Sequence, residues 1–195
     1  MSRLVLLRGS DYRRVRWKND GGWTTEIARD PADDALDFRW RVSIADIESD
    51  GPFSLFPGVD RDLVLLSGAG MDLDFADALP LRIDERFQHV HFRGECETQC
   101  RLIAGPTRDF NVMVRRGAMR AEVLARPLVG SMVIFPESHA EWLIHVHAGH
   151  ALARRGDSEI PAASGETILA GPDSGSGRMV LEGAGELVLA KFVRI

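Results

Sequence analysis

Short apolar and alternating segments recur along the whole chain, and most have the length and pattern of β-strands. Residues 63–66 and 187–190 are apolar runs, whereas 38–44 and 71–75 alternate between apolar and polar positions. Nineteen glycines and nine prolines interrupt these segments and leave little room for a long amphipathic helix. We expect further strands at 5–7, 132–135, 142–146 and 167–169, and short helical turns only near 11–14 and 44–48.

A faint internal repeat refines this all-β prediction. Residues 65–73 and 146–152 each contain an apolar strand, a glycine turn and a second strand, and each is followed about twenty residues later by a turn and another strand. This rhythm is typical of a small jelly-roll barrel, although a turn-rich β protein can produce it by chance. We therefore expect two barrels in one compact chain, divided into residues 1–115 and 116–195, with strands that can cross between the halves.

The segment 17–27 concentrates polar and aromatic side chains around a Gly-Gly turn. Glycine has no Cβ, so a ligand can approach the backbone closely at Gly21 and Gly22. Beyond the turn, strand alternation places Thr24 and Glu26 on one face. Two interpretations stay open: a small-molecule pocket, or a surface hairpin whose polar residues face water.

Three later segments carry further candidates. Arg41 and Ser43 alternate with apolar residues. Arg41 therefore either binds the carboxylate of a ligand or faces solvent. The turn-rich loop 50–61 ends in Arg61 and is either a binding loop or a plug in which two phenylalanines cover a barrel end. Asn111 shares one side of its strand with Asp109 and a methionine. The chain has no nucleophile elbow and no phosphate-binding glycine loop.

Two His-x-His pairs have the spacing of β-barrel metal ligands. His89 and His91 share a strand face, as do His145 and His147. Neither pair has a complete set of further ligands, so we interpret these histidines as hydrogen-bonded or exposed, and expect no metal and no cofactor. The two cysteines, 96 and 100, are too far apart on a strand to bridge and are expected to be free, buried or half-buried thiols.

Composition and charge exclude several classes of partner. The net charge is −5 and no basic stripe occurs, which argues against binding to nucleic acid. No apolar run approaches the roughly 20 residues of a membrane span, and the amino-terminal segment reads as a first strand instead of a secretory signal. The expected location is the cytoplasm. Arginine outnumbers lysine strongly, which suits the binding of carboxylates but also follows from a GC-rich genome.

Taken together, these motifs resemble the HutD/Ves family over roughly residues 15–113. The amino-terminal motif comprises Trp17, Asn19, Gly22, Thr24, Glu26 and Ile27. The next comprises Trp40, Arg41, Ser43 and Ala45, and it is followed by Gly51, Pro52, Phe53, Ser54, Phe56, Pro57, Gly58 and Arg61. Further matches are Leu65, Leu66, Gly68, Gly70, Phe92, Gly94, Glu95, Asp109, Phe110, Asn111 and Met113. His89 and His91 depart from the pattern, because apolar or small residues are expected before Phe92.

The resemblance implies a bicupin fold and a regulatory role in histidine utilisation. The protein would bind a small carboxylate intermediate, such as urocanate or N-formylglutamate, and limit the expression of the pathway. The resemblance implies neither an established catalytic activity nor an essential metal. Two rival functions stay open: a cupin enzyme acting on a small organic acid, and a protein-interaction module without a small ligand. Self-association into a homodimer is a mild expectation.

Carried over by position, the resemblance gives a candidate pocket of seven residues: Asn19, Thr24, Glu26, Arg41, Ser43, Arg61 and Asn111. We expect Arg61 and Arg41 to pair with a ligand carboxylate and the two asparagines to recognise an amide or imidazole edge. Glu26 would hold an arginine or accept from a ligand N–H. Apolar walls are expected from Trp23, Phe53 and Phe56, and architectural roles from Trp17, Gly22, Gly58 and Gly68.

Overall fold

The computed structural model describes residues 4–31, 38–172 and 177–195, and within them regular structure is β except for one 3₁₀ turn, η1 (Gly9–Asp11). The prediction of an all-β protein is confirmed. The first strands are β1 (Leu4–Leu7), β2 (Arg13–Arg16), β3 (Gly22–Asp30), β4 (Trp40–Ile47), β5 (Gly51–Pro52), β6 (Val59–Ser67), β7 (Met71–Phe75) and β8 (Leu81–Ile83). They are followed by β9 (His89–Arg93), β10 (Thr98–Leu102), β11 (Thr107–Arg115), β12 (Met119–Ile134), β13 (Ala140–Arg155), β14 (Ser158–Ala163), β15 (Thr167–Ala170) and β16 (Met179–Arg194).

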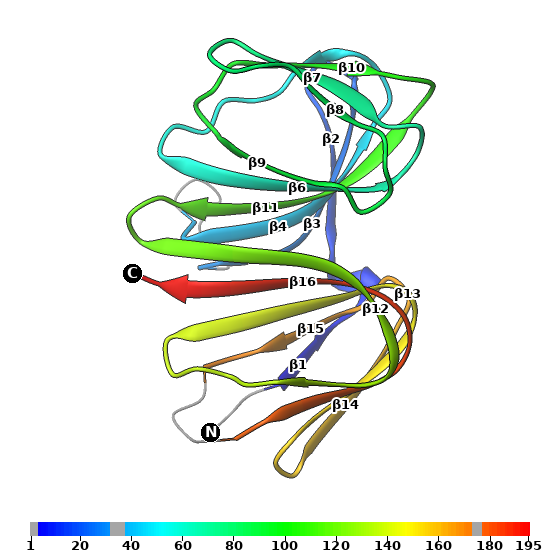
Figure 1. The fold of residues 1–195 in the computed structure, drawn as a ribbon, viewed down its shortest axis with the longest axis vertical. Coiled ribbons are helices and arrows are strands. Elements are labelled where there is room, and N and C mark those ends of the chain that lie inside the picture. Colours follow the sequence, from blue (N-terminus) through cyan, green and yellow to red (C-terminus); the bar gives the residue numbers. More distant parts are fainter. Residues whose placement is uncertain (1–3, 32–37, 173–176) are drawn as a thin grey trace. The chain divides into compact units, whose positions relative to one another are not determined.

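The chain divides into two compact units. The amino-terminal unit is Arg13–Ala118, and the carboxy-terminal unit combines Met1–Tyr12 with Met119–Ile195. Strand β1 joins the carboxy-terminal unit by pairing antiparallel with β15, where Leu4 lies opposite Ala170 (Figure 1). The boundary between residues 115 and 116 stays a prediction. Among the described residues, no helix combines the length and the apolar character that a membrane span requires.

The carboxy-terminal unit is one sheet with the order β1-β15-β13-β16-β12, and β14 pairs with the far part of β13. Three of its strands, β12, β13 and β16, are each sixteen residues long. Their alternating positions bury a cluster of aliphatic side chains with almost no exposed surface. The largest members of this cluster are Leu128, Ile134, Ile144, Val146, Ile168, Met179, Leu181, Leu187 and Leu189.

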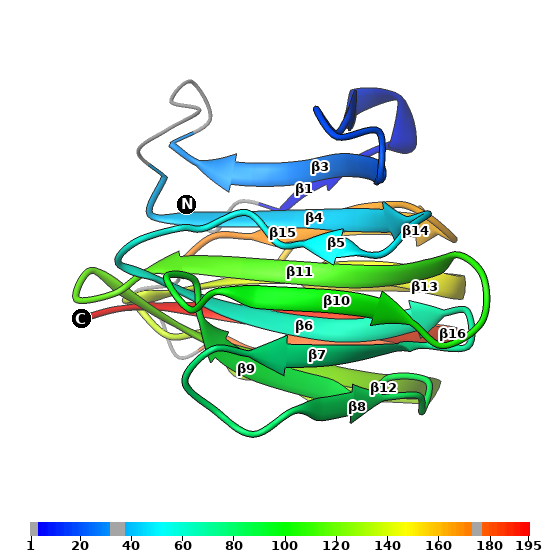
Figure 2. The ribbon, with the colours of Figure 1, turned by 90° about the horizontal axis from the view of Figure 1, so that it is seen from above.

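The amino-terminal unit contains two sheets. One has the order β2-β3-β4-β11-β6-β9, and the other has the order β5-β10-β7-β8. Figure 2 shows β3, β4, β11, β6 and β9 following one another across the larger sheet. Side chains from both sheets form one apolar cluster, so the sheets pack face to face. The larger sheet contributes Ala45, Ile47, Leu63, Leu65, Val90 and Phe92, and the smaller contributes Met71, Leu73, Ile83 and Cys100.

The structure corrects several local predictions. The helical turn expected at 44–48 is wrong, because β4 continues as a strand to Ile47. The turn expected at 11–14 lies earlier, at Gly9–Asp11, and Arg13–Arg16 is a strand. The strand expected at 132–135 is only the end of β12, whose pairing with β16 runs through Gly130 opposite Gly183. Neither glycine ends its strand, and at Gly183 an added Cβ would lie 2.2 Å from the carbonyl oxygen of His150, so glycine permits a close approach of two backbones there.

Candidate functional site

A pocket of about 700 Å³ lies on the inner face of the larger sheet of the amino-terminal unit. The face can be followed along β4, where Ala45 and Ile47 belong to the apolar core while Arg41 and Ser43 line the pocket. On the neighbouring β11, Asn111 lies opposite Ser43 and also lines the pocket. The same sheet face therefore changes from hydrocarbon to polar groups along its strands. A volume of this size is in the range of small-molecule sites.

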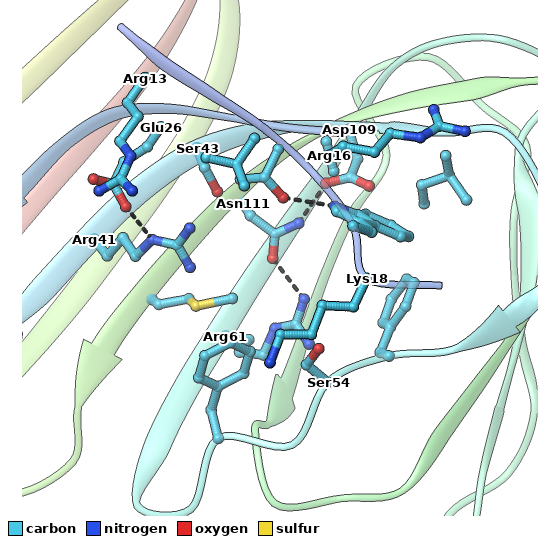
Figure 3. A pocket seen from close by; sticks show the side chains of 18 of the residues that line it. Arg13, Arg16, Lys18, Glu26, Arg41, Ser43, Ser54, Arg61, Asp109 and Asn111 are labelled. Carbon is cyan, nitrogen blue, oxygen red and sulfur yellow. Dashed lines mark hydrogen bonds and ion pairs between the residues drawn. The ribbon is translucent and has the colours of Figure 1, made fainter. Parts of the chain in front are cut away.

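All seven residues of the predicted site line this pocket. Register explains why: Glu26, Ser43 and Asn111 lie in one row across β3, β4 and β11, because each faces its neighbour directly. Figure 3 shows the polar side chains of these strands turned toward a common space. That the seven residues bind a ligand stays a prediction. The pocket brings together Asn19, Thr24, Glu26, Arg41, Ser43, Arg61 and Asn111.

Arg61 on β6 is the most buried cation in this wall, with 5% of its surface exposed. Its Nη2 donates to the side-chain carbonyl of Asn111 at 2.9 Å, and its Nε has no hydrogen-bond partner. The guanidinium carbon lies 5.2 Å from the ring centroid of Phe53, 5.7 Å from that of Phe56 and 4.8 Å from that of Phe92. Three aromatic rings attract a cation but cannot accept its N–H groups as an anion would.

Burial lowers the pKa of Arg61 to about 10; within this balance Asp109 acts to raise the pKa and Arg41 acts to lower it. The guanidinium is charged at neutral pH and surrounded by poor hydrogen-bond acceptors. A buried charge with an unmade hydrogen bond is unfavourable in the folded protein. A carboxylate beside the guanidinium would provide the opposite charge and a stronger acceptor than the aromatic rings.

Asp109 on β11 completes a chain of polar groups that begins at Arg61. The amide nitrogen of Asn111 donates to Oδ1 of Asp109, and Asn111 thereby connects the cation to the carboxyl group (Figure 3). Asp109 is completely buried and its Oδ2 has no partner. Burial raises the pKa of Asp109 to about 7, whereas Arg61 and Asn111 act to lower it. The protein uses one donor and one acceptor of Asn111, so this asparagine positions its neighbours; its expected recognition of an amide or imidazole edge stays a prediction.

Glu26 holds two arginines at the other end of the pocket. Its Oε2 accepts from Nε of Arg41 at 2.6 Å, and its Oε1 lies 2.6 Å from Nη2 of Arg29. This is one of the two roles expected for Glu26. The expected pairing of Arg41 with a ligand is limited to its terminal nitrogens, because its Nε is already taken. Arg29 escaped sequence reasoning because a bulge between Glu26 and Ala28 shifts the alternation of β3 and turns Arg29 to the pocket face.

The turn between β2 and β3 forms the opposite wall. Trp17 lines the pocket and donates its indole N–H to the hydroxyl of Thr24 at 2.8 Å. Asn19 accepts the backbone N–H of Gly21 through its Oδ1 at 3.1 Å, so this asparagine shapes the turn. Lys18 lines the pocket between them and was missed, since one lysine in a turn carries no pattern of its own.

The aromatic predictions are partly correct. Phe53 and Phe56 line the pocket, so the loop 50–61 supplies wall groups that also cover Arg61. Trp23 does not line the pocket, because it belongs to the other face of β3, where Arg14 and Arg16 lie over its ring at 4.8 and 5.1 Å. Trp17 was expected to be architectural and takes the wall position instead.

The histidines lie outside this pocket. His89 and His91 both contact Oδ1 of the buried Asp62, at 2.8 and 3.0 Å. His145 is buried, and its Nδ1 is 2.9 Å from the hydroxyl of Thr167. Within the described parts of the chain, no group of three or more histidine, cysteine, aspartate or glutamate side chains has an arrangement that could hold a metal ion. Cys96 is half-buried, Cys100 is buried and both are free, as predicted.

Cations dominate the lining of the pocket. Six lining side chains are arginine or lysine, and two are acidic. One of the two acids, Glu26, is shared between two arginines, and the other, Asp109, lies completely buried. The missed residues Arg13 and Lys18 add positive charge from β2 and the following turn (Figure 3). Arg16 was also missed and lines the pocket, but its guanidinium lies over Trp23 and pairs with Glu48. The protein as a whole is acidic, so this local excess favours an anionic ligand over a neutral one.

A protein family and bacterial proteins are similar to this chain in sequence. Residues 9–189 match the family model HutD. Over 123 residues the chain is 45% identical to an uncharacterized 21.2 kDa protein in the hutC 3′ region of Pseudomonas putida, covering 63% of this chain and 64% of that protein. Over 108 residues it is 39% identical to the protein Ves of Citrobacter koseri, covering 55% and 56%. The alignments thus span less than two thirds of the length of either relative.

Solved structures agree over the whole chain. A conserved protein of unknown function from Pseudomonas aeruginosa PAO1 has a TM-score of 0.86 at 31% identity, with 99% of both chains covered. HutD from Pseudomonas fluorescens SBW25, solved in a formate condition, has a TM-score of 0.81 at 29% identity, with 99% of this chain and 100% of that chain covered. Oxalate decarboxylase from Lactobacillus farciminis, at 9% identity and a TM-score of 0.71, covers 100% of this chain and 86% of its own and shows the cupin-like fold alone.

Proposed function

The chain belongs to the HutD family, and we propose that it binds a small carboxylate intermediate of histidine utilisation, such as urocanate or N-formylglutamate, without converting it. The observation that carries this proposal is Arg61, a buried guanidinium with an unpartnered Nε in the wall of a cationic pocket. A carboxylate bound there would form charge-assisted hydrogen bonds, which are about twice as strong as neutral ones.

The size and lining of the pocket also suit a small organic acid. Its apolar walls, Phe53 and Phe56, flank the buried cation, while Arg13 and Lys18 supply further positive charge. One carboxylate would lie against Arg61, and the rest of a small planar or extended acid would lie along the aromatic rings. A second carboxylate, if present, would meet these further cations. Small-molecule sites typically combine such apolar contacts with a few polar groups that orient the ligand.

The regulatory part of the proposal follows from the family. HutD proteins are associated with the histidine utilisation locus, and one relative is named for its position beside hutC. A protein that binds an intermediate and leaves it unchanged could report the concentration of that intermediate, and thereby limit how strongly the pathway is expressed. This role would place the protein in the cytoplasm, where such intermediates are produced.

The architecture is proposed to be a bicupin. Support comes from the division of the chain into two β units and from the cupin-like fold of its structural neighbours. The amino-terminal unit, with its two packed sheets, would be the ligand-binding barrel. The carboxy-terminal unit, with its aliphatic interior, would be the second barrel.

Calorimetric titration with urocanate and with N-formylglutamate tests the binding proposal. We expect saturable binding of at least one of them, and a loss of roughly 30-fold or more in affinity for Arg61→Met, since truncating one partner of a buried charged contact costs about 2–5 kcal/mol. The control is Arg101→Met, because Arg101 is an exposed residue paired with Asp74 outside the pocket. Equal affinities in both variants would place the ligand elsewhere. No binding of either acid would favour a protein-interaction module.

One observation favours a second candidate, a cupin enzyme. Asp109 has a pKa of about 7 in the pocket wall, and general acid–base catalysis works best with a group whose pKa lies near the working pH. Incubating the protein with a hundredfold excess of each acid and following its ¹H NMR spectrum separates the two functions. We expect the signals of the acid to stay unchanged over hours; conversion beyond one equivalent would establish turnover.

A further inference from the structure

The hydrogen-bonded chain from Arg61 through Asn111 to Asp109 has, at each end, an atom without a hydrogen-bond partner. Nε of Arg61 lacks an acceptor, and Oδ2 of Asp109 lacks any partner, although both atoms are buried. Between them, Asn111 accepts from the guanidinium and donates to Oδ1 of Asp109. The two ends are therefore coupled through one amide, and a change of charge at one end acts on the other.

We propose that the pocket takes up one proton with its carboxylate ligand, and that Oδ2 of Asp109 receives this proton. The inference rests on the proposed function, because it requires an anion at Arg61. In the free protein Arg61 is the main charge that favours the ionised form of Asp109. A ligand carboxylate against the guanidinium offsets that charge. The ionised form of Asp109 is then less stable, its pKa rises, and it takes a proton from solvent. The ligand remains an anion, and no bond other than O–H forms.

The geometry determines which oxygen carries the proton. Oδ1 of Asp109 already accepts the amide hydrogen of Asn111, and Asn111 cannot turn around without losing its contact with Arg61. Oδ2 is the only oxygen that can be protonated without breaking this chain. Burial raises the pKa of Asp109 to about 7 in the free protein. A small further rise of this pKa is therefore enough to protonate the carboxyl group near physiological pH.

The surroundings of Asp109 contain few other groups that could take the proton. Asp46 on β4 adds negative charge that raises the pKa of Asp109, and burial in β10 raises the pKa of Cys100 to about 12, so Cys100 is a neutral thiol. Glu26 on β3 is held by two arginines. The remaining charged residues that line the pocket are cations and offer no carboxylate: Arg13, Arg16, Lys18, Arg29 and Arg41. Asp109 is thus the acceptor that the described pocket offers.

A consequence for specificity follows. A ligand that brings one anionic charge to Arg61 and takes up one proton leaves the buried chain with an unchanged net charge. A neutral analogue, such as the primary amide of the same acid, would bring no anion and would drive no proton uptake. The site is therefore expected to select ionised acids over their amides, and to do so more strongly as the pH falls toward 7.

Calorimetry in buffers of different ionisation enthalpy tests this inference on the wild-type protein. N-formylglutamate is the suitable probe, because both of its carboxyl groups are ionised above pH 6 and contribute no protons of their own. At pH 7.5 we expect uptake of a substantial fraction of one proton per ligand bound. Above pH 7 the affinity should weaken by up to about tenfold per pH unit. Binding without proton uptake would overturn the inference and leave the proposed function standing.

The Asp109→Asn variant identifies the acceptor. It should bind N-formylglutamate with no proton uptake and with an affinity that is constant from pH 7 to 8.5. Asp74→Asn, which alters a half-buried carboxylate on β7 outside the pocket, should retain the wild-type proton uptake. Unchanged proton uptake in Asp109→Asn would overturn the assignment. If that variant does not fold, the wild-type measurement still decides, and a complete absence of binding by the wild type would overturn both proposals.

Discussion

The interiors of the two units are built from different side chains although both units are made of β-strands. In the carboxy-terminal unit the buried cluster is aliphatic, and the buried His145 is satisfied by the hydroxyl of Thr167, which also contacts the hydroxyl of Tyr12 at 2.7 Å. In the amino-terminal unit the inner sheet face changes from hydrocarbon to Arg61 and Asp109, each with an unpartnered buried atom. The aliphatic interior stabilises the fold. The polar interior opposes stability until a ligand completes it.

The largest expected effect comes from truncating the aliphatic interior. Leu187 on β16 is completely buried, so Leu187→Ala should lower the free energy of unfolding by about 2–5 kcal/mol. Binding of N-formylglutamate at temperatures where the variant is folded should not change, because the pocket lies in the other unit. Urea unfolding and calorimetry measure the two quantities. Leu124→Ala, at a half-exposed position of β12, is the control and should change stability by less than about 0.5 kcal/mol.

The second prediction uses pH to separate the two interiors. Burial, with a smaller contribution from His147, lowers the pKa of His145 to about 4, against about 6.5 in the unfolded chain. Between these values the unfolded chain binds more protons, so His145 makes stability fall as the pH falls from 6.5 to 4. Asp109, with a pKa of about 7 when folded and about 3.9 when unfolded, makes stability fall as the pH rises from 4 to 7.

Within this window the two groups therefore act with opposite sign, each by up to about 1.4 kcal/mol per pH unit. Asp109→Asn should leave a protein that loses stability on acidification, and His145→Asn should leave one that loses stability as the pH rises from 4 to 7. Urea unfolding at pH 4.5, 5.5 and 6.5 gives the slopes. His139→Asn, an exposed histidine, is the control. Variants whose slopes equal that of the wild type would contradict the contrast between the two interiors.

Sequence patterns predicted the fold class and the polar strand face of the amino-terminal unit. Alternation along 38–44 and 109–113 identified the polar face that carries Arg41, Ser43 and Asn111, because strand geometry turns every second side chain the same way. The length of β12, β13 and β16 was missed because glycines were interpreted as turns. Gly149 and Gly185 lie opposite each other inside paired strands, and a Cβ on Gly185 would lie 2.0 Å from the carbonyl oxygen of Ala148.

The site was predicted less completely than the fold. Arg29 was missed because a bulge reverses the alternation of β3. No residue type in that part of the sequence indicates a bulge. Asp109 was placed on the correct side of its strand, but its importance depends on complete burial and an unpartnered oxygen, which are properties of the folded chain. Asn19 and Asn111 were assigned to a ligand, whereas much of their hydrogen-bonding capacity is used by Gly21, Arg61 and Asp109.

The smallest expected effect concerns the charge balance of the pocket. Glu26→Gln removes the carboxylate that Arg29 and Arg41 share, and it leaves both arginines more positive toward a ligand. We expect the affinity for N-formylglutamate to rise by about threefold, which is the effect of a partly screened charge, about 0.6 kcal/mol. Glu159→Gln removes a carboxylate that pairs with Arg154 outside the pocket and serves as the control. A decrease in affinity for Glu26→Gln would mean that the shared pair orients the arginines.

A crystal structure of the protein with N-formylglutamate tests the central claim most directly. We predict a ligand carboxylate oxygen within about 2.7–3.2 Å of a guanidinium nitrogen of Arg61, with the acyl chain along Phe53 and Phe56. A ligand bound outside the pocket, or an Arg61 guanidinium that contacts no ligand oxygen in the complex, would contradict the account.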